Sequence, residues 1–291
     1  MRQPLLIMGD YIKIEFEHLN SEQKEIIIAL LIEMNYEGFE EDDDLLKAFI
    51  LSTIYDENKL KTFCKSRRLS FSVSKLENKN WNTHWETNFQ PVIINHSIHK
   101  TPWVAIRAAF HESINGIKHE LIITPKMSFG TGHHATTSMM IKMMSELDFS
   151  GKTILDFGTG TGILAILSEK LGASNIIAID NDDQSIQNAG ENFVSNNCSK
   201  IQLLEASTAN VDIKFDIILA NIIKGVILDN LTAFAKEMVK EGVILISGLL
   251  ADDEQEILEK AIENNLILDK KVEDKNWICL QMAYKSTGFQ R

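Results

Sequence analysis

A glycine-rich turn at residues 156–162, which reads DFGTGTG, is the part of the sequence best suited to bind a small molecule. It follows an apolar segment, and we expect a helix after it through about Leu171. Glycines let a backbone approach a ligand closely, and the first turn of a helix has free N–H groups. A second apolar segment, residues 175–179, ends in Asp180 at about the 20-residue spacing where an acid meets ribose hydroxyls in such folds. The pattern predicts a site for a nucleotide-type cofactor.

Two cofactors compete for this turn. Residues 160–165, GTGILA, fit the dinucleotide pattern G-x-G-x-x-A, so a nicotinamide-dependent dehydrogenase is one interpretation. Asp156 argues against it, because a pyrophosphate brings negative charge to the turn, and two like unit charges ~4 Å apart repel by about 4 kcal/mol at an effective dielectric of 20. S-adenosylmethionine carries an ammonium and a sulfonium, which a carboxylate attracts. The pattern D-x-G-x-G-x-G followed by an acid on the next strand resembles the cofactor motif of class I methyltransferases, and we favour that interpretation.

A second glycine-bearing segment lies upstream, where residues 125–137 read PKMSFGTGHHATT. We expect it to join a strand to a helix and to form a lid, with Phe129 shielding the reactive methyl group. Thr136 and Thr137 could instead simply cap the helix. Adjacent histidines at 133 and 134 point apart and have no nearby carboxylate or cysteine cluster, so we expect no metal site.

The third segment is residues 215–221, FDIILAN, whose continuous apolar run predicts a buried parallel strand that ends in Asn221. Methyltransferases that act on planar amide or base nitrogens often have Asn/Asp-Pro-Pro-aromatic here, whereas this chain has Ile222 and Ile223 after the asparagine. The difference argues against an adenine, cytosine or glutamine acceptor. Asn221 is then available to orient substrate or cofactor, or, more simply, to cap the next helix.

The elements that must position these residues form two parts. Residues 11–17 alternate strictly between apolar and charged, which predicts a half-buried strand, and the order through residue 77 is β-α-β-β-α-β, that of a ferredoxin-like unit. Residues 78–102 are predicted to be a structured linker. From residue 103 to 291 strands and helices alternate, so we expect a Rossmann-like, doubly wound, mostly parallel sheet covered on both faces. The predicted fold is α/β with a small α+β domain in front.

Composition excludes several classes of protein. The 291 residues include 29 Lys plus Arg and 41 Asp plus Glu, a net charge of −12, which argues against binding nucleic acid by bulk electrostatics. With 44% hydrophobic and 24% charged residues the chain is typical of a globular enzyme. The three cysteines match no zinc or redox spacing. No apolar run is long enough for a membrane span or a signal peptide, so we expect a cytoplasmic protein.

Taken together, these segments resemble the family of ribosomal protein L-eleven (L11) methyltransferases, the PrmA type. The resemblance covers roughly residues 81–279, and the N-terminal unit agrees in architecture more than in residues. The matching segments are residues 129–137 (F-G-T-G-x-H-x-T-T), 156–162 (the cofactor turn), 220–222 (A-N-I) and 81–91 (W-x-x-x-W-x-x-x-F-x-P). Residues 246–250, ISGLL, resemble the family's L-S-G-I-L. Ala135 stands where the family commonly has proline.

The resemblance implies a protein N-methyltransferase that transfers methyl groups from S-adenosylmethionine to lysine side chains and the N-terminal α-amine of ribosomal protein L11. Residues 1–77 would recognise this basic substrate, and we expect a monomer. The cofactor-binding residues it implies, together with the turn, are Thr137, Asp156, Gly158, Gly160, Gly162, Asp180 and Asn221. Asn221 would also orient the substrate, and Phe129 would flank the cofactor. A methyltransferase for another amine and a non-catalytic binder of S-adenosylmethionine stay open as alternatives.

Overall fold

A computed structural model describes residues 11–42, 45–76, 90–124, 132 and 134–285 of the chain. The chain divides into two compact units, residues 1–87 and 88–291. Phe129, Trp81 and Trp85 lie outside the described residues. None of the helices in the described part is long and apolar enough to cross a membrane.

The N-terminal unit has its six elements in the order that alternation and capping residues predict. They are β1 (Tyr11–Glu17), α1 (Ser21–Ile32), β2 (Gly38–Asp42), β3 (Leu45–Leu51), α2 (Glu57–Arg67) and β4 (Phe71–Leu76). The strands form an antiparallel sheet in the order β2-β3-β1-β4. Asn20 begins α1 with the expected capping box, because its side chain accepts from Gln23 N at 2.8 Å and Gln23 Oε1 accepts in return from Asn20 N at 3.0 Å.

One face of this sheet carries the core of the unit. Ile14 and Phe16 of β1 are fully buried and pack with Leu31 of α1 and Leu60 of α2. Lys13 and Glu15 alternate with them on the opposite face and form an ion pair at 2.9 Å. The period of two in β1 therefore separates core from charge, as predicted.

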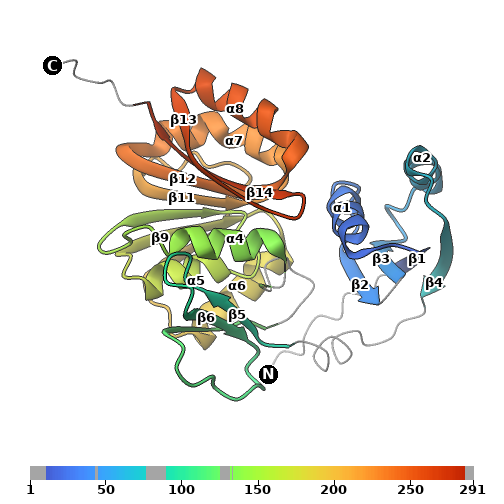
Figure 1. The fold of residues 1–291 in the computed structure, drawn as a ribbon, viewed down its shortest axis with the longest axis horizontal. Helices are drawn as coiled ribbons and strands as arrows, with labels where there is room; N and C mark the ends of the chain where they lie inside the picture. The colour runs from blue at the N-terminus through green and yellow to red at the C-terminus, as the bar shows by residue number, and fades with distance from the viewer. Residues whose placement is uncertain (1–10, 43–44, 77–89, 125–131, 133, 286–291) are drawn as a thin grey trace. The chain divides into compact units, whose positions relative to one another are not determined.

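The second unit contains a seven-stranded sheet in the order β10-β9-β8-β11-β12-β14-β13 (Figure 1). Its strands are β8 (Thr153–Phe157), β9 (Asn175–Asp180), β10 (Ile201–Glu205), β11 (Phe215–Asn221), β12 (Met238–Leu250), β13 (Leu266–Asp274) and β14 (Trp277–Tyr284). The first five are parallel, and β14 is antiparallel to both β12 and β13. This is the Rossmann-like, doubly wound fold that the sequence predicts. Its strand order reverses at β8 and β11, where such sheets bind ligands.

Helices cover both faces of this sheet. On one face lie α7 (Lys224–Glu237) and α8 (Glu254–Glu263), preceded by a short turn of 3₁₀ helix, Ala251–Asp253. On the other lie α4 (Ala135–Met144), α5 (Ile163–Lys170) and α6 (Asp183–Ser195) (Figure 1). The continuous apolar runs of β8, β9 and β11 follow from this burial on both sides.

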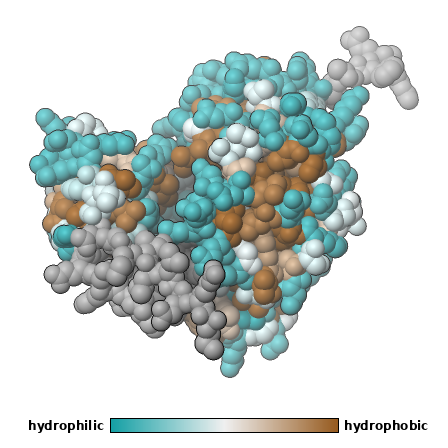
Figure 2. Space-filling view, turned by 180° about the vertical axis from the view of Figure 1, so that it is seen from behind, coloured by the Kyte–Doolittle hydropathy of each residue, from teal (hydrophilic) through white to brown (hydrophobic). Residues whose placement is uncertain are grey.

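A separate three-stranded sheet, which the sequence analysis did not predict, precedes the large one. It has the order β5-β6-β7, with β5 (Val92–Asn95) antiparallel and β7 (His119–Ile122) parallel to β6 (Pro102–Arg107). β5 lies within residues 78–102, the segment interpreted from sequence as a linker. Figure 2 shows hydrophobic residues gathered over one side of the second unit.

Candidate active site

Three polar side chains stand at the carboxyl ends of neighbouring parallel strands, where the strand order reverses. Asp156 lies near the end of β8, Asp180 ends β9 and Asn221 ends β11. Because β8 pairs with both β9 and β11, these ends lie side by side. The structure thus brings together residues that the sequence analysis selected from three separate segments.

Asp156 is buried and is fixed by its own turn. Its Oδ2 accepts from Thr159 Oγ1 at 2.6 Å and from Ala165 N, in the first turn of α5, at 3.0 Å. Burial raises the pKa of the Asp156 carboxyl to about 7, the two hydrogen bonds act in the opposite direction, and the charge of Asp180 adds to the rise. A cation placed beside this carboxyl would stabilise its ionised form.

Asp180 is held by backbone N–H groups. Its Oδ2 accepts from Gly160 N at 2.8 Å, and its Oδ1 accepts from Asn181 N at 2.9 Å and Asp182 N at 3.1 Å. Burial raises its pKa, and these three bonds counteract the rise. A carboxylate has about four lone-pair positions, so Asp180 has room for about one further donor.

Asn221 connects β11 to α4. Its Nδ2 lies 3.2 Å from Thr137 Oγ1, while its Oδ1 is buried and has no hydrogen-bond partner among the described residues. A buried unpaired acceptor is costly, so this oxygen is suited to accept from a bound group. The simpler interpretation of Asn221 as a helix cap is wrong, because α7 begins after Ile223 and has no side-chain cap.

The glycines of the turn have the geometry that the motif requires. Gly158 has φ 71° and Gly162, at the start of α5, has φ 80°, both in the left-handed region where only glycine is unstrained. A Cβ on Gly158 would lie 2.1 Å from Ile222 Cγ2. Gly160 presents its N–H to Asp180.

Ile222 is held from a second side by Gly248 of β12. A Cβ on Gly248 would lie 2.3 Å from Ile222 O, and Ile222 N donates to Ser247 O at 3.1 Å. The register of β12 against β14 shifts at this point, between Ile246 and Leu249. The two glycines thus fix the residue that follows Asn221, a role that the sequence analysis did not assign.

The start of α4 differs from the sequence-based interpretation. The cap of α4 is the His134 side chain, which accepts from Thr136 N, and not a threonine hydroxyl. The His134 ring also packs edge-on against Trp277, with ring centroids 4.7 Å apart. Thr136 and Thr137 are both fully buried, which leaves Thr137 to contact Asn221. Phe129, predicted to be in the lid, lies outside the described residues.

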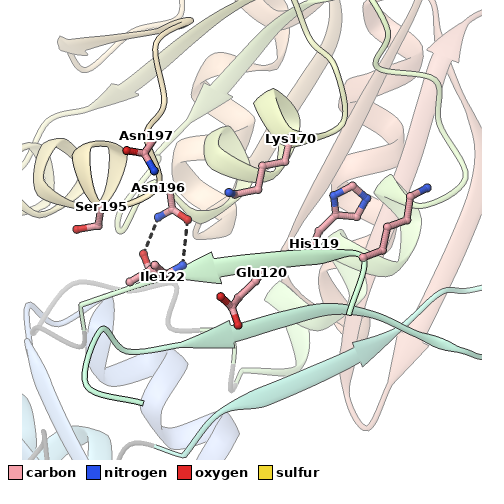
Figure 3. A pocket seen from close by; sticks show the side chains of 8 residues that line it. His119, Glu120, Ile122, Lys170, Ser195, Asn196 and Asn197 are labelled. Atoms are coloured by element: carbon pink, nitrogen blue, oxygen red, sulfur yellow. Dashed lines mark hydrogen bonds between the residues drawn. The ribbon is translucent and has the colours of Figure 1, made fainter. Parts of the chain in front are cut away.

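An open pocket of about 520 Å³ lies elsewhere, beside Lys118, His119 and Lys170 (Figure 3). Lys170 ends α5, whereas the glycine turn begins it, so this pocket is at the opposite end of that helix from Asp156. It plays no part in the site.

The chain matches the family described as "Ribosomal protein L11 methyltransferase (PrmA)" over residues 11–285. It belongs to this family. Proteins named ribosomal protein L11 methyltransferase are similar along almost the whole chain: one from Phocaeicola vulgatus is 34% identical over 274 residues, covering 91% of this chain and 95% of that protein. One from Porphyromonas gingivalis is 36% identical over 267 residues, covering 89% and 90%.

A solved structure supports the same conclusion. A ribosomal protein L11 methylase from Lactobacillus delbrueckii subsp. bulgaricus is 32% identical, with a TM-score of 0.57 over 66% of this chain and 98% of that one. The protein is therefore an S-adenosylmethionine-dependent methyltransferase with a class I fold, and the dehydrogenase interpretation of the turn is wrong.

The donor groups of the site fit this cofactor. Asp156 and Asp180 offer two carboxylates, and Asn221 offers an amide oxygen that no described residue pairs, a set that suits ammonium, sulfonium and hydroxyl groups. A dinucleotide would instead place pyrophosphate charge beside two carboxylates whose pKa values are already raised by burial.

Proposed function

We propose that this protein methylates amines of ribosomal protein L11, at lysine side chains and at the N-terminal α-amine. The observation that carries the proposal is the meeting of Asp156, Asp180 and Asn221 at the reversal of strand order, in a chain that matches the L11 methyltransferase family from residue 11 onward. The match includes the N-terminal unit, which an enzyme for a small amine does not require.

We assign the cofactor contacts to Thr137, Gly158, Asp180 and Asn221, with Gly160 and Gly162 shaping the turn. The ionised Asp156 would hold the cationic end of the cofactor, directly or through water. Phe129 would flank the cofactor. Asn221 would orient the substrate or the cofactor through its free Oδ1, because that oxygen is buried without a partner among the described residues.

When bound, S-adenosylmethionine supplies a methyl group on a positively charged sulfur, and the attacking amine must be neutral. The amine nitrogen would form its new bond to that methyl carbon while the cofactor would leave as a neutral thioether, and the methylated nitrogen would then release a proton to water. A free lysine has a pKa of about 10.4, so presenting the neutral amine at pH 7 costs roughly 4.6 kcal/mol. Removing water from the ammonium on binding would lower that pKa, and holding nitrogen, methyl carbon and sulfur in line would lower the remaining barrier.

The N-terminal unit, residues 1–77 in the sequence analysis, is proposed to recognise the protein substrate. The net charge of −12 supports a basic partner, because complementary charge speeds encounter and suppresses wrong partners. The same charge supports the absence of direct nucleic-acid binding. We further propose a monomer that acts in the cytoplasm, where ribosomal proteins are made.

Mass spectrometry of purified ribosomal protein L11, incubated with the full-length protein and S-adenosylmethionine, tests this function. Stepwise gains of methyl mass on lysines and on the N-terminus are expected, and they should fall sharply with the Asn221→Ala variant. A second basic protein serves as the specificity control. Equal methylation of both proteins, or no methylation of L11 by a protein that binds the cofactor, would contradict the proposed substrate.

A further inference from the structure

The outer edge of β7 is held by asparagine side chains of α6 instead of by another strand. Asn196, which follows the last residue of α6, accepts from Ile122 N at 3.0 Å through Oδ1 and donates to Ile122 O at 2.7 Å through Nδ2 (Figure 3). One helical turn earlier, Asn192 Oδ1 accepts from Thr124 N at 2.9 Å. Ile123 N points the other way and donates to Arg107 O at 2.8 Å, as alternation along an extended chain requires.

Helix and strand spacing make this contact possible. Four residues of α-helix rise about 6.0 Å, and two residues of extended chain rise about 6.6 Å. Asn192 in α6 and Asn196, the residue after it, therefore meet backbone groups two residues apart at the end of β7, in Thr124 and Ile122. The same amide chemistry is presented twice, at Asn192 and at Asn196.

The two asparagines differ in their second contact. Asn192 Nδ2 donates to Thr161 O in the cofactor turn at 2.9 Å, whereas Asn196 Nδ2 donates to Ile122 O and Asn192 O. Asn192 and Thr161 are both fully buried. A single buried amide therefore joins the strand end at Thr124 to the glycine turn.

Thr161 lies between Gly160 and Gly162, the two glycines that position the N–H groups bound to Asp180 and Asp156. Gly160 N donates to Asp180, and Gly162 begins α5, whose Ala165 N donates to Asp156. A shift of the Thr161 carbonyl would move both N–H groups relative to the carboxylates that they orient.

We propose that Asn192 is a positioning residue of the methyltransferase site, which holds the cofactor turn against the end of β7 so that Asp156 and Asp180 keep their places. It touches neither substrate nor cofactor. Asn196 binds the backbone of the same strand through its side-chain amide, and its hydrogen bonds to Ile122 and Asn192 do not reach the cofactor turn. The proposal rests on cofactor binding by this family's fold and not on the identity of the protein substrate.

The test compares Asn192→Ala with Asn196→Ala in the full chain. Both variants remove partners from half-buried backbone groups of Ile122 or Thr124, so both should lose a similar amount of thermal stability. Calorimetric titration with S-adenosylmethionine should show about fivefold weaker binding for Asn192→Ala, the factor to which the typical net contribution of one hydrogen bond corresponds, and unchanged binding for Asn196→Ala.

Amide hydrogen exchange gives a second measurement that needs no ligand. The amides of Gly160 and Ala165 should exchange faster in Asn192→Ala and at the wild-type rate in Asn196→Ala. If Asn192→Ala does not fold, Asn192→Ser, which keeps a small polar group in the same space, is measured in its place. Equal cofactor affinity and equal exchange in the two variants would overturn the proposal. Failure of the wild-type protein to methylate L11 would overturn the proposed substrate and leave this inference standing.

Discussion

In β1 of the N-terminal unit the charged side chains of Lys13 and Glu15 lie on the face of the sheet opposite the core, whereas in the second unit the carboxylates of Asp156, which is buried, and Asp180, which is half-buried, lie at the carboxyl ends of strands. Lys13 and Glu15 are each partly exposed and pair with each other at 2.9 Å. Asp156 is 1% exposed and is surrounded by fixed donors of its own turn. The exposed ion pair of the first unit therefore changes the free energy of unfolding very little. Burying the carboxylates of the second unit lowers the stability of the fold, and a bound cation would offset that loss.

The comparison predicts that a substitution in one unit destabilises that unit and leaves the other unchanged. The substitution with the largest expected effect tests this prediction. Phe16→Ala removes a fully buried ring from the N-terminal core and should lower the free energy of unfolding of that unit by about 3–5 kcal/mol. Cofactor affinity should stay at the wild-type value while methylation of L11 falls. Calorimetric unfolding and cofactor titration measure the two effects.

Phe215→Ala is the matched control, since Phe215 is equally buried but belongs to β11 of the second unit. It should weaken cofactor binding, because β11 carries Asn221. Loss of cofactor affinity in the Phe16→Ala variant would contradict the division of the chain into independent units.

A pH series probes the cost of the buried carboxyl. The pKa of Asp156 is near 3.8 when exposed and is raised to about 7 in the fold, so between these values the folded state holds a proton that the unfolded state has released. Stability should therefore fall as pH rises from about 4 to about 7, by up to roughly 4 kcal/mol, and Asp156→Asn should remove this slope. Denaturant unfolding at several pH values measures it.

Cofactor affinity should change with pH in the opposite direction. A cation binds the ionised Asp156 best, so the dissociation constant of the cofactor should rise as pH falls below 7, approaching about tenfold per pH unit. Asp156→Asn should make the profile flat. A flat profile in the wild-type protein would mean that Asp156 is already ionised before the cofactor binds.

Substitutions at two glycines distinguish the cost of a left-handed backbone from the cost of a steric clash at the cofactor turn. Gly158 and Gly151 have φ of 71° and 70°, but a Cβ on Gly151 meets nothing within 4 Å, whereas one on Gly158 would meet Ile222 at 2.1 Å. Gly151→Ala should cost about 1–2 kcal/mol for the left-handed backbone alone. Gly158→Ala should cost about 1–3 kcal/mol more. Equal losses in urea unfolding would show that Ile222 moves aside freely.

The smallest effect is expected in the N-terminal unit. The Glu15 carboxylate accepts from Lys13 at 2.9 Å and from Ser72 at 3.4 Å, and the Lys13 contact is the main reason that its pKa is lowered. Because the pair is partly exposed, Glu15→Gln should change the free energy of unfolding by less than about 1 kcal/mol and leave cofactor affinity unchanged. A loss comparable to that of Phe16→Ala would contradict the contrast between the two units.

Local patterns in the sequence predicted the elements well. Alternation in residues 11–17 predicted β1, and the apolar run ending in Asn221 predicted β11, because burial on one face or on two leaves a direct mark on the residues. The glycine motif and its spacing to Asp180 located the cofactor end of the sheet for the same reason.

The parts that were missed depend on pairings between distant residues. No sequence pattern near Val92 predicts that β5 pairs with β6 in a separate sheet. The Thr136–Thr137 pair resembled a helix cap, but His134 takes that place, since its ring both accepts from Thr136 N and packs on Trp277, far along the chain. The sequence analysis assigned no role to Asn192 and Asn196, which lie four residues apart. Their partners at Ile122 and Thr124 were not predictable from α6 alone.

The asparagines on α6 also determine how the small sheet ends. An unpaired strand edge can accept a strand from another chain, and proteins avoid aggregation by blocking such edges. At β7 the outward N–H and C=O of Ile122 and the N–H of Thr124 are already taken by Asn196 and Asn192. The carboxyl end of this edge, at Ile122 and Thr124, is therefore closed by side chains, which prevents a strand of a second molecule from pairing there.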